Sequence, residues 1–522
     1  MCAMNLVNGS DSCESEELIM GLLKEEAGFP GFVVPDIGGQ KTLNGSANGG
    51  LDWASDQLWT PENFVELVTS GQVSEERVDD MVIRNVIGWY RIGADDGKFP
   101  ELAEQGDYRP IPKNHRKLIR ENGAKSIVLL KNVDNALPLR QPRTLSLFGA
   151  NAGAHVSGPN EAFNIGGVSG EVYQGHLATA SGAGSAPLPY LITPHQALTE
   201  RVVEDNTQFR YILNDTFSGG STGFINSGAS TGVNPSVENY AQFSEACLVF
   251  INAWGGEGGD RSELCNEVSD NLVNTVASNC NNTIVVVNTV GPRILDSWIE
   301  SPNVTAVLYS APLGQESGHS IVDVLYGDVN PSAALTYTIA KIEDDYPARP
   351  CEEINCEFTE GNYIDYKHFD KNDIEPRFEF GFGLSYTTFE YSNLKIKTKG
   401  KNAKPGPAKG KKAVGGREDL WDEAVNVQIK VANTGDVDGD HVVQVYLTFP
   451  NEADQPIRQL RGFEKVSLKK GKSSKIDIKL RRRDISYWNE ASQEWVVAKG
   501  EYTVNVGASS RDLRQTGKFT LE

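Results

Sequence analysis

The chain has 522 residues, of which 39% are hydrophobic and 23% charged, and its formal net charge is -21. Such a composition is typical of a globular protein with sizeable cores, and the length corresponds to about three domains. The acidic balance argues against nucleic acid as a partner, because phosphate binding needs a basic surface, and no apolar run reaches the ~18 residues of a membrane span.

Residues 1–95 alternate between predicted helices and a strand. Ser15 is placed to cap a helix that Gly28 ends, and the apolar segment GFVVPD that follows predicts a strand. Thr60 and Ser74 each precede a further helix. One face of the last helix carries Val78, Met81, Val82, Asn85, Val86 and Trp89. The segment therefore predicts a piece of an α/β fold, whereas a complete (β/α)8 barrel needs about 250 residues.

A second α/β pattern follows a charged linker at 96–114 and covers residues 115–345. It begins with a helix from His115 to Gly123 and continues with the strand candidates SIVLLKN, TLSLFGA, CLVFINAW, TIVVVNTV and VTAVLYS. Continuous apolar runs separated by helices are typical of a mostly parallel sheet covered on both faces, so an α/β sandwich is expected. Two Gly- and Ser-rich stretches, 153–187 and 216–236, predict long loops.

The remaining residues predict a connecting segment at 346–387 and an all-β domain at 388–522. Alternation with polar neighbours marks Val425 to Val431, Val443 to Leu447, Ile476 to Leu480 and Tyr502 to Val506 as strands of a β-sandwich. Residues 397–416 are rich in Lys, Gly and Pro with almost no apolar content, which predicts a disordered insertion.

The seven cysteines show no spacing that is persuasive for a zinc site. In a secreted protein, local disulfides between Cys265 and Cys280 and between Cys351 and Cys356 would be plausible; in the cytosol all of these would be thiols. Five Asn-x-Ser/Thr sequons favour an extracellular protein, and they begin at Asn8, Asn44, Asn214, Asn281 and Asn303. The first residues, MCAMNLVNGS, lack the basic start and apolar core of a secretory signal.

Two acidic residues follow predicted strands. Asp36 comes directly after GFVVP, and Glu257 stands in AWGGEGGDR after CLVFINA, with two glycines on each side. Carboxylates at the ends of separate strands can act as nucleophile and acid/base in glycoside hydrolysis, and a retaining enzyme holds them about 5–5.5 Å apart. The structural alternatives are that Asp36 caps a turn and that Glu257 is merely exposed in a loop.

Several long segments, in order, resemble fungal β-glucosidases of glycoside hydrolase family 3. They include MCAMNLVNG, GLLKEEAGF, HRKLIRENGAKSIVLLKNVDNALPL, INAWGGEGGDR, LGQESGHSIVDVLYGDVNPS and FEFGFGLSYTTF. The resemblance covers nearly the whole chain. It implies α/β plus all-β architecture: a carboxy-terminal remnant of a (β/α)8 barrel, an α/β sandwich and a fibronectin-type-III-like domain.

The resemblance also implies a retaining mechanism with Asp36 as nucleophile and Glu257 as acid/base. The substrates would be β-glucosides or cello-oligosaccharides, with no metal and no organic cofactor. The resemblance implies a secreted glycoprotein with no nucleic-acid or membrane partner and leaves a homodimer open.

The sequence departs from the family pattern around Asp36. Met4 stands where a sugar-contacting Tyr is usual, Pro35 replaces a Ser, and Ile37 replaces the Trp that flanks the sugar. The segment GLDWASDQLW also differs from the usual Gly-Leu/Met-Asp-Met-x-Met-Pro-Gly. Loss of the Trp would remove a stacking surface for the sugar ring.

Three functional interpretations follow. The first is an active β-glucosidase whose preceding sequence would supply a signal peptide and about six of the eight barrel strands. The second is an inactive, amino-terminally truncated homologue that binds carbohydrate or another protein. The third is another activity of the family, such as β-xylosidase or N-acetylglucosaminidase. For a truncated chain, we expect the second and third domains to pack on each other through Phe378 to Phe389 and the first part to expose apolar surface.

Overall fold

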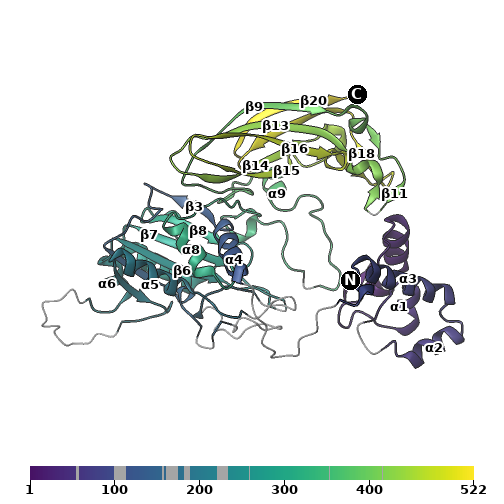
Figure 1. The fold of residues 1–522 in the computed structure, drawn as a ribbon, viewed down its shortest axis with the longest axis horizontal. Helices are drawn as coiled ribbons and strands as arrows, with labels where there is room; N and C mark the ends of the chain where they lie inside the picture. Colours follow the sequence, from purple (N-terminus) through teal and green to yellow (C-terminus); the bar gives the residue numbers. More distant parts are fainter. Residues whose placement is uncertain are drawn as a thin grey trace. The chain divides into compact units, whose positions relative to one another are not determined.

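The computed structural model describes residues 1–54, 58–98, 113–155, 158–159, 174–180, 188–219, 233–257, 259–351, 353–413 and 415–522. The chain forms two compact units (Figure 1). Unit 1 combines Met1–Pro110 with Lys404–Ala424 and Arg481–Val497, and unit 2 combines Ile111–Ala403, Val425–Leu480 and Ala498–Glu522. The third predicted domain is therefore shared between the two units.

The predicted capping residues lie at or next to the starts of three helices of unit 1. Helix η2 (Glu17–Glu26) has π-helical hydrogen bonds, Ser15 accepts from the backbone N–H of Leu18 at 3.4 Å, and Gly28 has φ +64°. Helices α2 (Pro61–Thr69) and α3 (Glu75–Arg91) are capped by the hydroxyls of Thr60 and Ser74. The unit also contains helix α1 (Leu43–Gly49) and the two-stranded sheet of β1 (Leu6–Val7) and β2 (Ser10–Asp11).

Helix α3 buries only part of its predicted apolar face within unit 1. Met81 packs with Leu67 and Val73, and Val78 lies against the same cluster. Val82, Val86 and Trp89 are exposed, with 54%, 42% and 50% of their surface accessible. The prediction that this part of the chain exposes apolar surface is confirmed.

The predicted strand GFVVPD is an extended segment rather than a regular strand. Its pairing is a single parallel bridge between Pro35 and Cys2. A longer ladder would need a neighbouring parallel strand along its whole length, and the described part of unit 1 provides one only at Cys2.

The part of unit 1 that comes from the third predicted domain contains short strands. These are β10 (Gly406–Pro407), β11 (Lys412–Ala413), β12 (Gly416–Arg417), β17 (Ser486–Asn489) and β18 (Glu494–Val497). Strand β18 pairs with both β10 and β17. The prediction of a disordered insertion at 397–416 is therefore wrong for the described residues. The buried guanidinium of Arg482 explains the difference, because it donates to the carbonyls of Lys404, Gly406 and Pro407 and replaces the missing apolar contacts.

Unit 2 contains the predicted α/β sandwich. Its six-stranded sheet has the order β3-β8-β7-β6-β4-β5. The strands are β3 (Val128–Asn132), β4 (Thr144–Phe148), β5 (Gln208–Ile212), β6 (Ala246–Ala253), β7 (Thr283–Thr289) and β8 (Val304–Ser310). All neighbours are parallel except β3, which runs antiparallel to β8. The mostly parallel sheet is confirmed, whereas β5 was not predicted.

Helices cover both faces of this sheet (Figure 1). One face packs against α4 (Lys113–Lys125), α5 (Pro194–Asp205) and α8 (Ser317–Leu325). The other packs against α6 (Val237–Gln242) and α7 (Glu267–Asn279). All residues of β6 and β7 are buried, which explains their uninterrupted apolar sequences. Much of the predicted loops 153–187 and 216–236, and residues 99–112 of the linker, lie outside the described residues.

The β-sandwich framework also belongs to unit 2. One sheet has the order β16-β13-β9 and the other β15-β14-β19-β20. The strands are β9 (Phe389–Thr398), β13 (Glu423–Asn433), β14 (Gly439–Thr448), β15 (Gln459–Leu468), β16 (Ser473–Arg481), β19 (Gly500–Gly507) and β20 (Leu513–Leu521). The alternating residues of the four predicted strands are buried, as a sandwich with one inner face per sheet requires.

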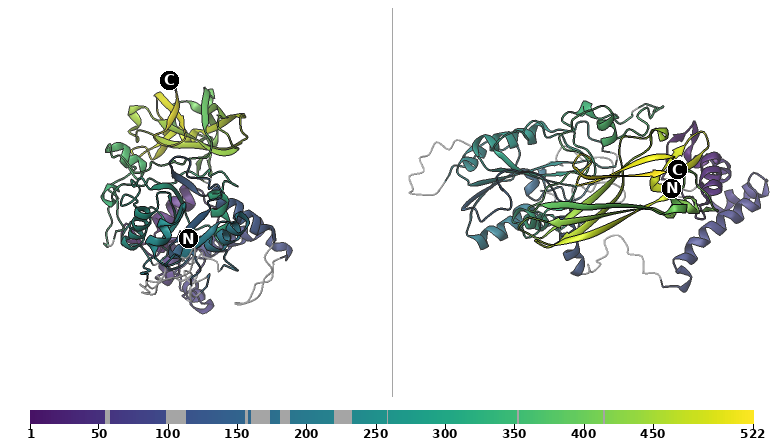
Figure 2. Two further views of the ribbon diagram at one scale, coloured as in Figure 1. Left: turned by 90° about the vertical axis from the view of Figure 1, so that its left-hand side faces the viewer. Right: turned by 90° about the horizontal axis from the view of Figure 1, so that it is seen from above.

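The connecting segment joins the sandwich to the α/β domain, and Figure 2 (left) shows the two stacked. Phe378 and Phe382 pack against the core of the α/β domain. The backbone N–H of Leu384 donates to the carbonyl of Leu129 at 2.9 Å, and the side chain of Gln444 donates to the carbonyl of Gly381 at 3.0 Å. The predicted packing through the aromatic segment is confirmed.

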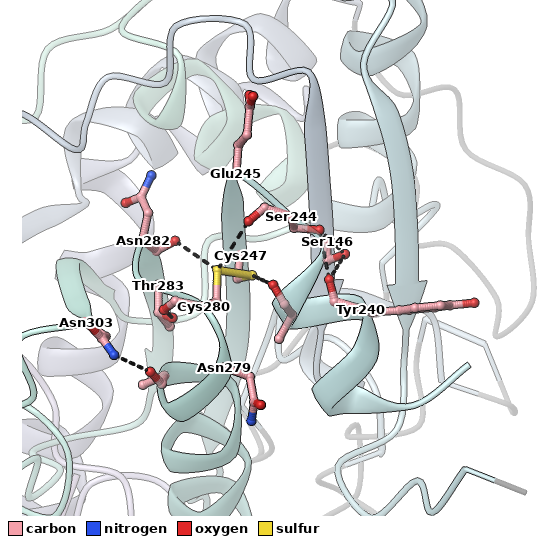
Figure 3. Close-up of a disulfide and its surroundings, with 12 residues drawn as sticks. Ser146, Tyr240, Ser244, Glu245, Cys247, Asn279, Cys280, Asn282, Thr283 and Asn303 are labelled. Atoms are coloured by element: carbon pink, nitrogen blue, oxygen red, sulfur yellow. Dashed lines mark hydrogen bonds between the residues drawn. A yellow bond between two sulfur atoms is a disulfide. The ribbon is translucent and has the colours of Figure 1, made fainter. Parts of the chain in front are cut away.

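Three disulfides are present: Cys2–Cys13, Cys247–Cys280 and Cys351–Cys356. The predicted pair Cys351–Cys356 is confirmed, but the pair Cys265–Cys280 is wrong. Cys280 precedes β7 and bonds Cys247 of the neighbouring parallel strand β6 (Figure 3). Cys265 is exposed and its thiol is free, and partial loss of water around the sulfur together with the neighbouring Glu263 raises its pKa to about 11. Adjacent strands bring together cysteines that are 33 residues apart in sequence.

Candidate active site

Asp36 is fixed by its backbone at the end of the extended segment in unit 1. Its N–H donates to the carbonyl of Cys2 at 2.9 Å, and the N–H of Cys2 donates to the carbonyl of Val34 at 2.9 Å. Cys2 is in turn linked to Cys13, which lies within the core of the unit. Asp36 therefore stands where this short parallel pairing ends, the position predicted from the sequence.

A tight turn follows Asp36 and leaves its carboxylate half-buried. The carboxylate accepts from the N–H of Ile37 at 2.7 Å, and the carbonyl of Asp36 accepts from the N–H of Gly39 at 2.9 Å. Gly38 has φ +74°, a left-handed conformation that a side chain would strain. Ile37 and Met4 are exposed.

A buried ionic cluster supports the segment that carries Asp36. The carboxylate of Asp52 accepts from Lys24 at 2.6 Å, from Arg77 at 2.8 Å and from the N–H of Val33 at 2.8 Å. Burial lowers the pKa of Lys24, although the hydrogen bond to Asp52 opposes this effect. The sequence analysis missed these residues. Two features of the sequence could have indicated the cluster. Lys24 is the single Lys of its helix, and Asp52 follows the short helix α1.

Glu257 lies at the tip of a hairpin that follows β6 in unit 2. Gly256 and Gly259 exchange backbone hydrogen bonds of 3.3 and 3.0 Å, so Glu257 stands between two paired residues and is exposed. Strand β6 adjoins β4, and the chain order reverses between these two strands. Ligands of open α/β sheets bind at such a switch point, beyond the carboxyl ends of the strands.

Buried polar side chains line the same edge of the sheet. Asn151 donates to Asn288 at 2.9 Å, and Asn288 donates to Ser310 at 2.9 Å. His176 contacts the carbonyl of Asn151 and the hydroxyl of Ser317, both at 2.6 Å. Burial lowers the pKa of His176 to about 4, so the imidazole is neutral at physiological pH. A neutral ring with one donor and one acceptor nitrogen satisfies both contacts.

The turn after β7 forms a rigid support beside the Glu257 hairpin. The carbonyl of Gly291 accepts from the hydroxyls of Thr289, Tyr309 and Tyr337, at 2.9, 3.3 and 3.1 Å. Burial raises the pKa of both tyrosines, which keeps them protonated as donors. The guanidinium of Arg261 donates to the carbonyl of Pro292 at 2.7 Å. Sequence reasoning quoted Arg261 within AWGGEGGDR but assigned it no role.

Asp36 and Glu257 thus stand in different units, Asp36 at the end of an extended segment and Glu257 in a hairpin after β6, with glycines near each of them. Among the residues with described positions, no group of three or more His, Cys, Asp or Glu is arranged to hold a metal ion. The helices of the same residues include none long and apolar enough to cross a membrane.

Comparison with known families finds two matching domains. Residues 127–386 match the glycosyl hydrolase family 3 C-terminal domain, and residues 441–510 match the fibronectin type III-like domain. These ranges contain the α/β domain with the Glu257 hairpin and part of the β-sandwich.

Relatives extend the likeness to the whole chain. It is 55% identical to a probable beta-glucosidase D of Aspergillus niger and 54% identical to that of Aspergillus flavus, covering 100% of this chain and 69% of each relative. The beta-D-glucoside glucohydrolase of Trichoderma reesei is 37% identical in sequence, with a TM-score of 0.88 over 99% of this chain and 72% of that one. A beta-glucosidase of Chaetomella raphigera is also 37% identical in sequence, with a TM-score of 0.89 over 99% of this chain and 71% of that one.

The order of domains, the two carboxylates at strand ends and the identity over the full length agree with one another. The chain belongs to glycoside hydrolase family 3, among the fungal β-glucosidases.

Proposed function

We propose that the protein hydrolyses terminal, non-reducing β-D-glucosyl residues of β-glucosides and cello-oligosaccharides with retention of configuration. Asp36 is the nucleophile and Glu257 the acid/base. The observation that carries the proposal is the identity of more than half the residues to relatives named probable beta-glucosidases over 100% of the chain.

The reaction has two displacements. In the first, a carboxylate oxygen of Asp36 bonds the anomeric carbon while the bond from that carbon to the leaving oxygen breaks. The protonated Glu257 gives its proton to this oxygen. In the second, Glu257 removes a proton from water, the water oxygen bonds the anomeric carbon, and the ester to Asp36 breaks. The two carboxyl groups must lie about 5–5.5 Å apart for this sequence.

The local geometry supports these roles. The half-buried carboxylate of Asp36 is oriented by a hydrogen bond from the backbone N–H of Ile37, and a nucleophile needs such a fixed position. Glu257 is exposed at the tip of a short hairpin, where water and a leaving group have access. The turn residues Gly38 and Gly256 allow close approach of a ligand to the backbone.

The test is hydrolysis of 4-nitrophenyl β-D-glucoside by the 522-residue chain and by the variants Asp36→Ala and Glu257→Ala. We expect the unsubstituted chain to hydrolyse this substrate, and each substitution to lower the activity at least ~1,000-fold. Asp296→Ala serves as a matched control, because this half-buried carboxylate pairs with Arg377 elsewhere in unit 2.

Azide separates the two roles. With Glu257→Ala, azide should attack the glycosyl-enzyme and give the β-glucosyl azide. With Asp36→Ala, azide should take the place of the nucleophile and give the α-glucosyl azide. The same anomer from both variants would refute the assignment of nucleophile and acid/base.

Binding without hydrolysis is the second candidate function. It is favoured by Met4 and Ile37, which are exposed and differ from the usual family residues. If the chain and both carboxylate variants hydrolyse the substrate equally slowly, titration calorimetry with glucose and cellobiose decides whether a carbohydrate site is present.

The protein is further proposed to work outside the cell. Three disulfides favour an oxidising compartment, and the sequons provide acceptors for glycans. The net charge of -21 disfavours phosphate-rich partners. Recovery of the protein from the medium of its producing cells, with the three disulfides formed and Cys265 free, is the expected result.

A further inference from the structure

We propose that Arg261 is a positioning residue, which holds the Glu257 hairpin on the turn formed by residues 289–293. The inference rests on the proposed role of Glu257 as acid/base. It adds a residue that fixes where this carboxyl group stands relative to the leaving oxygen.

The first step of the argument is the direct contact. Arg261 follows the hairpin, two residues after Gly259, and its guanidinium donates to the carbonyl of Pro292 at 2.7 Å. Charge-assisted hydrogen bonds of this kind are stronger than bonds between neutral groups. The side chain is only half-exposed, so the bond is partly protected from water.

Glycines on both sides make room for this side chain. A methyl group at Gly291 would lie 3.3 Å from a terminal nitrogen of Arg261, and one at Gly255 would lie 4.0 Å from its aliphatic part. Gly291 also has φ +81°, so the turn is built to let the guanidinium lie across it.

The support itself is rigid. Three hydroxyls converge on the carbonyl of Gly291, and the hydroxyl of Tyr309 also accepts from the N–H of Arg293 at 3.1 Å. Both Tyr309 and Arg293 are almost completely buried. A hydrogen bond from the Glu257 hairpin to this turn therefore restricts the movement of the hairpin.

Contacts before and after the hairpin join it to the same turn that Arg261 contacts. The N–H of Val290 donates to the carbonyl of Ala253 at 2.8 Å before the hairpin, and the N–H of Ile294 donates to the carbonyl of Leu264 at 2.7 Å after it. Between these points, the guanidinium of Arg261 bonds the carbonyl of Pro292, and Val290 packs against the cluster of Trp254 and Leu177. Arg261 therefore anchors the strand of the hairpin that follows Glu257, and Trp254 anchors the strand that precedes it.

The experiment compares the full chain with Arg261→Ala and Arg261→Lys. Arg210→Ala is the matched control, since Arg210 is also half-exposed and donates to a backbone carbonyl, that of Phe243, at 3.0 Å. Amide hydrogen exchange of peptides from residues 254–264 should be about tenfold faster in Arg261→Ala, and unchanged in the control. Arg261→Lys keeps a donor and should recover part of the protection.

Leaving-group dependence gives the second measurement. A misplaced acid costs most when the leaving group needs a proton, so Arg261→Ala should lose about 100-fold in kcat/KM for cellobiose. For 2,4-dinitrophenyl β-D-glucoside, whose leaving group is a weak base, the loss should be less than about tenfold. An equal loss for both substrates would mean that Arg261 serves folding alone and would overturn the inference.

The two proposals fail in different ways. If the unsubstituted chain hydrolyses neither substrate, the proposed function fails, and exchange alone decides the role of Arg261. Unchanged exchange in Arg261→Ala refutes the positioning role in any case. Faster exchange confined to residues 254–264 supports it.

Discussion

At the scale of single residues, Asp52 has the most consequential environment in unit 1. Its fully buried carboxylate neutralises Lys24 and Arg77 and also accepts from the backbone of Val33. Val33 belongs to the segment that ends in Asp36, so the hydrogen bond from Val33 to Asp52 also fixes that segment. One carboxylate therefore couples the stability of this unit to the position of the proposed nucleophile.

Replacing Asp52 with Asn should destabilise unit 1 by about 3–5 kcal/mol, because two cations lose their buried counter-charge. Urea unfolding, followed by limited proteolysis of residues 1–98, would measure the change. Asp79→Asn is the control, since Asp79 is exposed on the same helix as Arg77. Equal effects of the two substitutions would contradict the importance of the buried pair.

Also at this scale, the sequons should differ in glycan occupancy. Asn214 is exposed, whereas the side-chain amide of Asn303 donates to the carbonyl of Ala277 at 2.7 Å (Figure 3) and is half-buried. A glycan on Asn303 would compete with this contact at the end of α7. Glycopeptide mass spectrometry of secreted protein should find Asn214 occupied and Asn303 largely unmodified, and Asn214→Gln should remove the glycopeptide at position 214. Similar occupancy at both sites would show that the contact has no influence.

The candidate site was predictable only in part at this scale. The positions of Asp36 and Glu257 after apolar segments followed from the sequence, because strand ends can be recognised locally. The roles of Asp52 and Arg261 could not be recognised in the same way. Their partners Lys24, Arg77 and Pro292 lie 25 to 31 residues away in sequence, and only the fold brings them together.

At the scale of elements, the disulfide between β6 and the start of β7 links two central strands. Cys247 and Cys280 are both buried and close a loop of 33 residues, whereas Cys351 and Cys356 are exposed and only five apart. In the chain-entropy model, the longer loop contributes about 3–4 kcal/mol.

The double variant Cys247→Ala/Cys280→Ala should therefore unfold at distinctly lower urea concentration than the unsubstituted chain. Cys351→Ala/Cys356→Ala, the matched control, should change the midpoint much less. If the control loses as much stability, loop length and burial do not determine the contribution of these bonds.

The elements themselves were largely predictable. Uninterrupted apolar sequences identified β6, β7 and β8, and caps located the starts of α2 and α3. Strand β5 was not predicted because Gln208 to Ile212 contains polar residues and no apolar run, as an edge strand allows. The segment 397–416 was misjudged because its order comes from Arg482, far along the chain, rather than from its own side chains.

At the scale of the whole molecule, the buried His176 and the half-buried His441 should set the pH range in which unit 2 is stable. Burial lowers the pKa of both His176 and His441 to about 4, whereas each titrates near 6.5 when unfolded. His441 lies on Phe389 and contacts the hydroxyl of Tyr391 at 2.7 Å, with Arg514 opposing and Asp512 favouring its protonation. Between these pKa values, protons bind the unfolded chain but not the folded one.

Stability should therefore be complete above about pH 6.5 and fall towards pH 4, by up to about 3 kcal/mol for each histidine. Melting temperatures from pH 4 to 7.5 would measure this decline. His441→Gln removes one of the two titrating groups, so its curve should be flatter over the same range. If the melting temperature of His441→Gln falls with pH as steeply as that of the unsubstituted chain, His441 does not cause the loss of stability.

The division into units has a consequence for chimeras between relatives. The chain passes from one unit to the other at five points, after Pro110, Ala403, Ala424, Leu480 and Val497. A protein engineer who exchanges residues 388–522 as one cassette would therefore transplant two pieces of unit 1 together with the sandwich framework. Recombination that respects the fold needs several junctions, so these enzymes should tolerate the shuffling of whole domains less well than their linear domain order suggests.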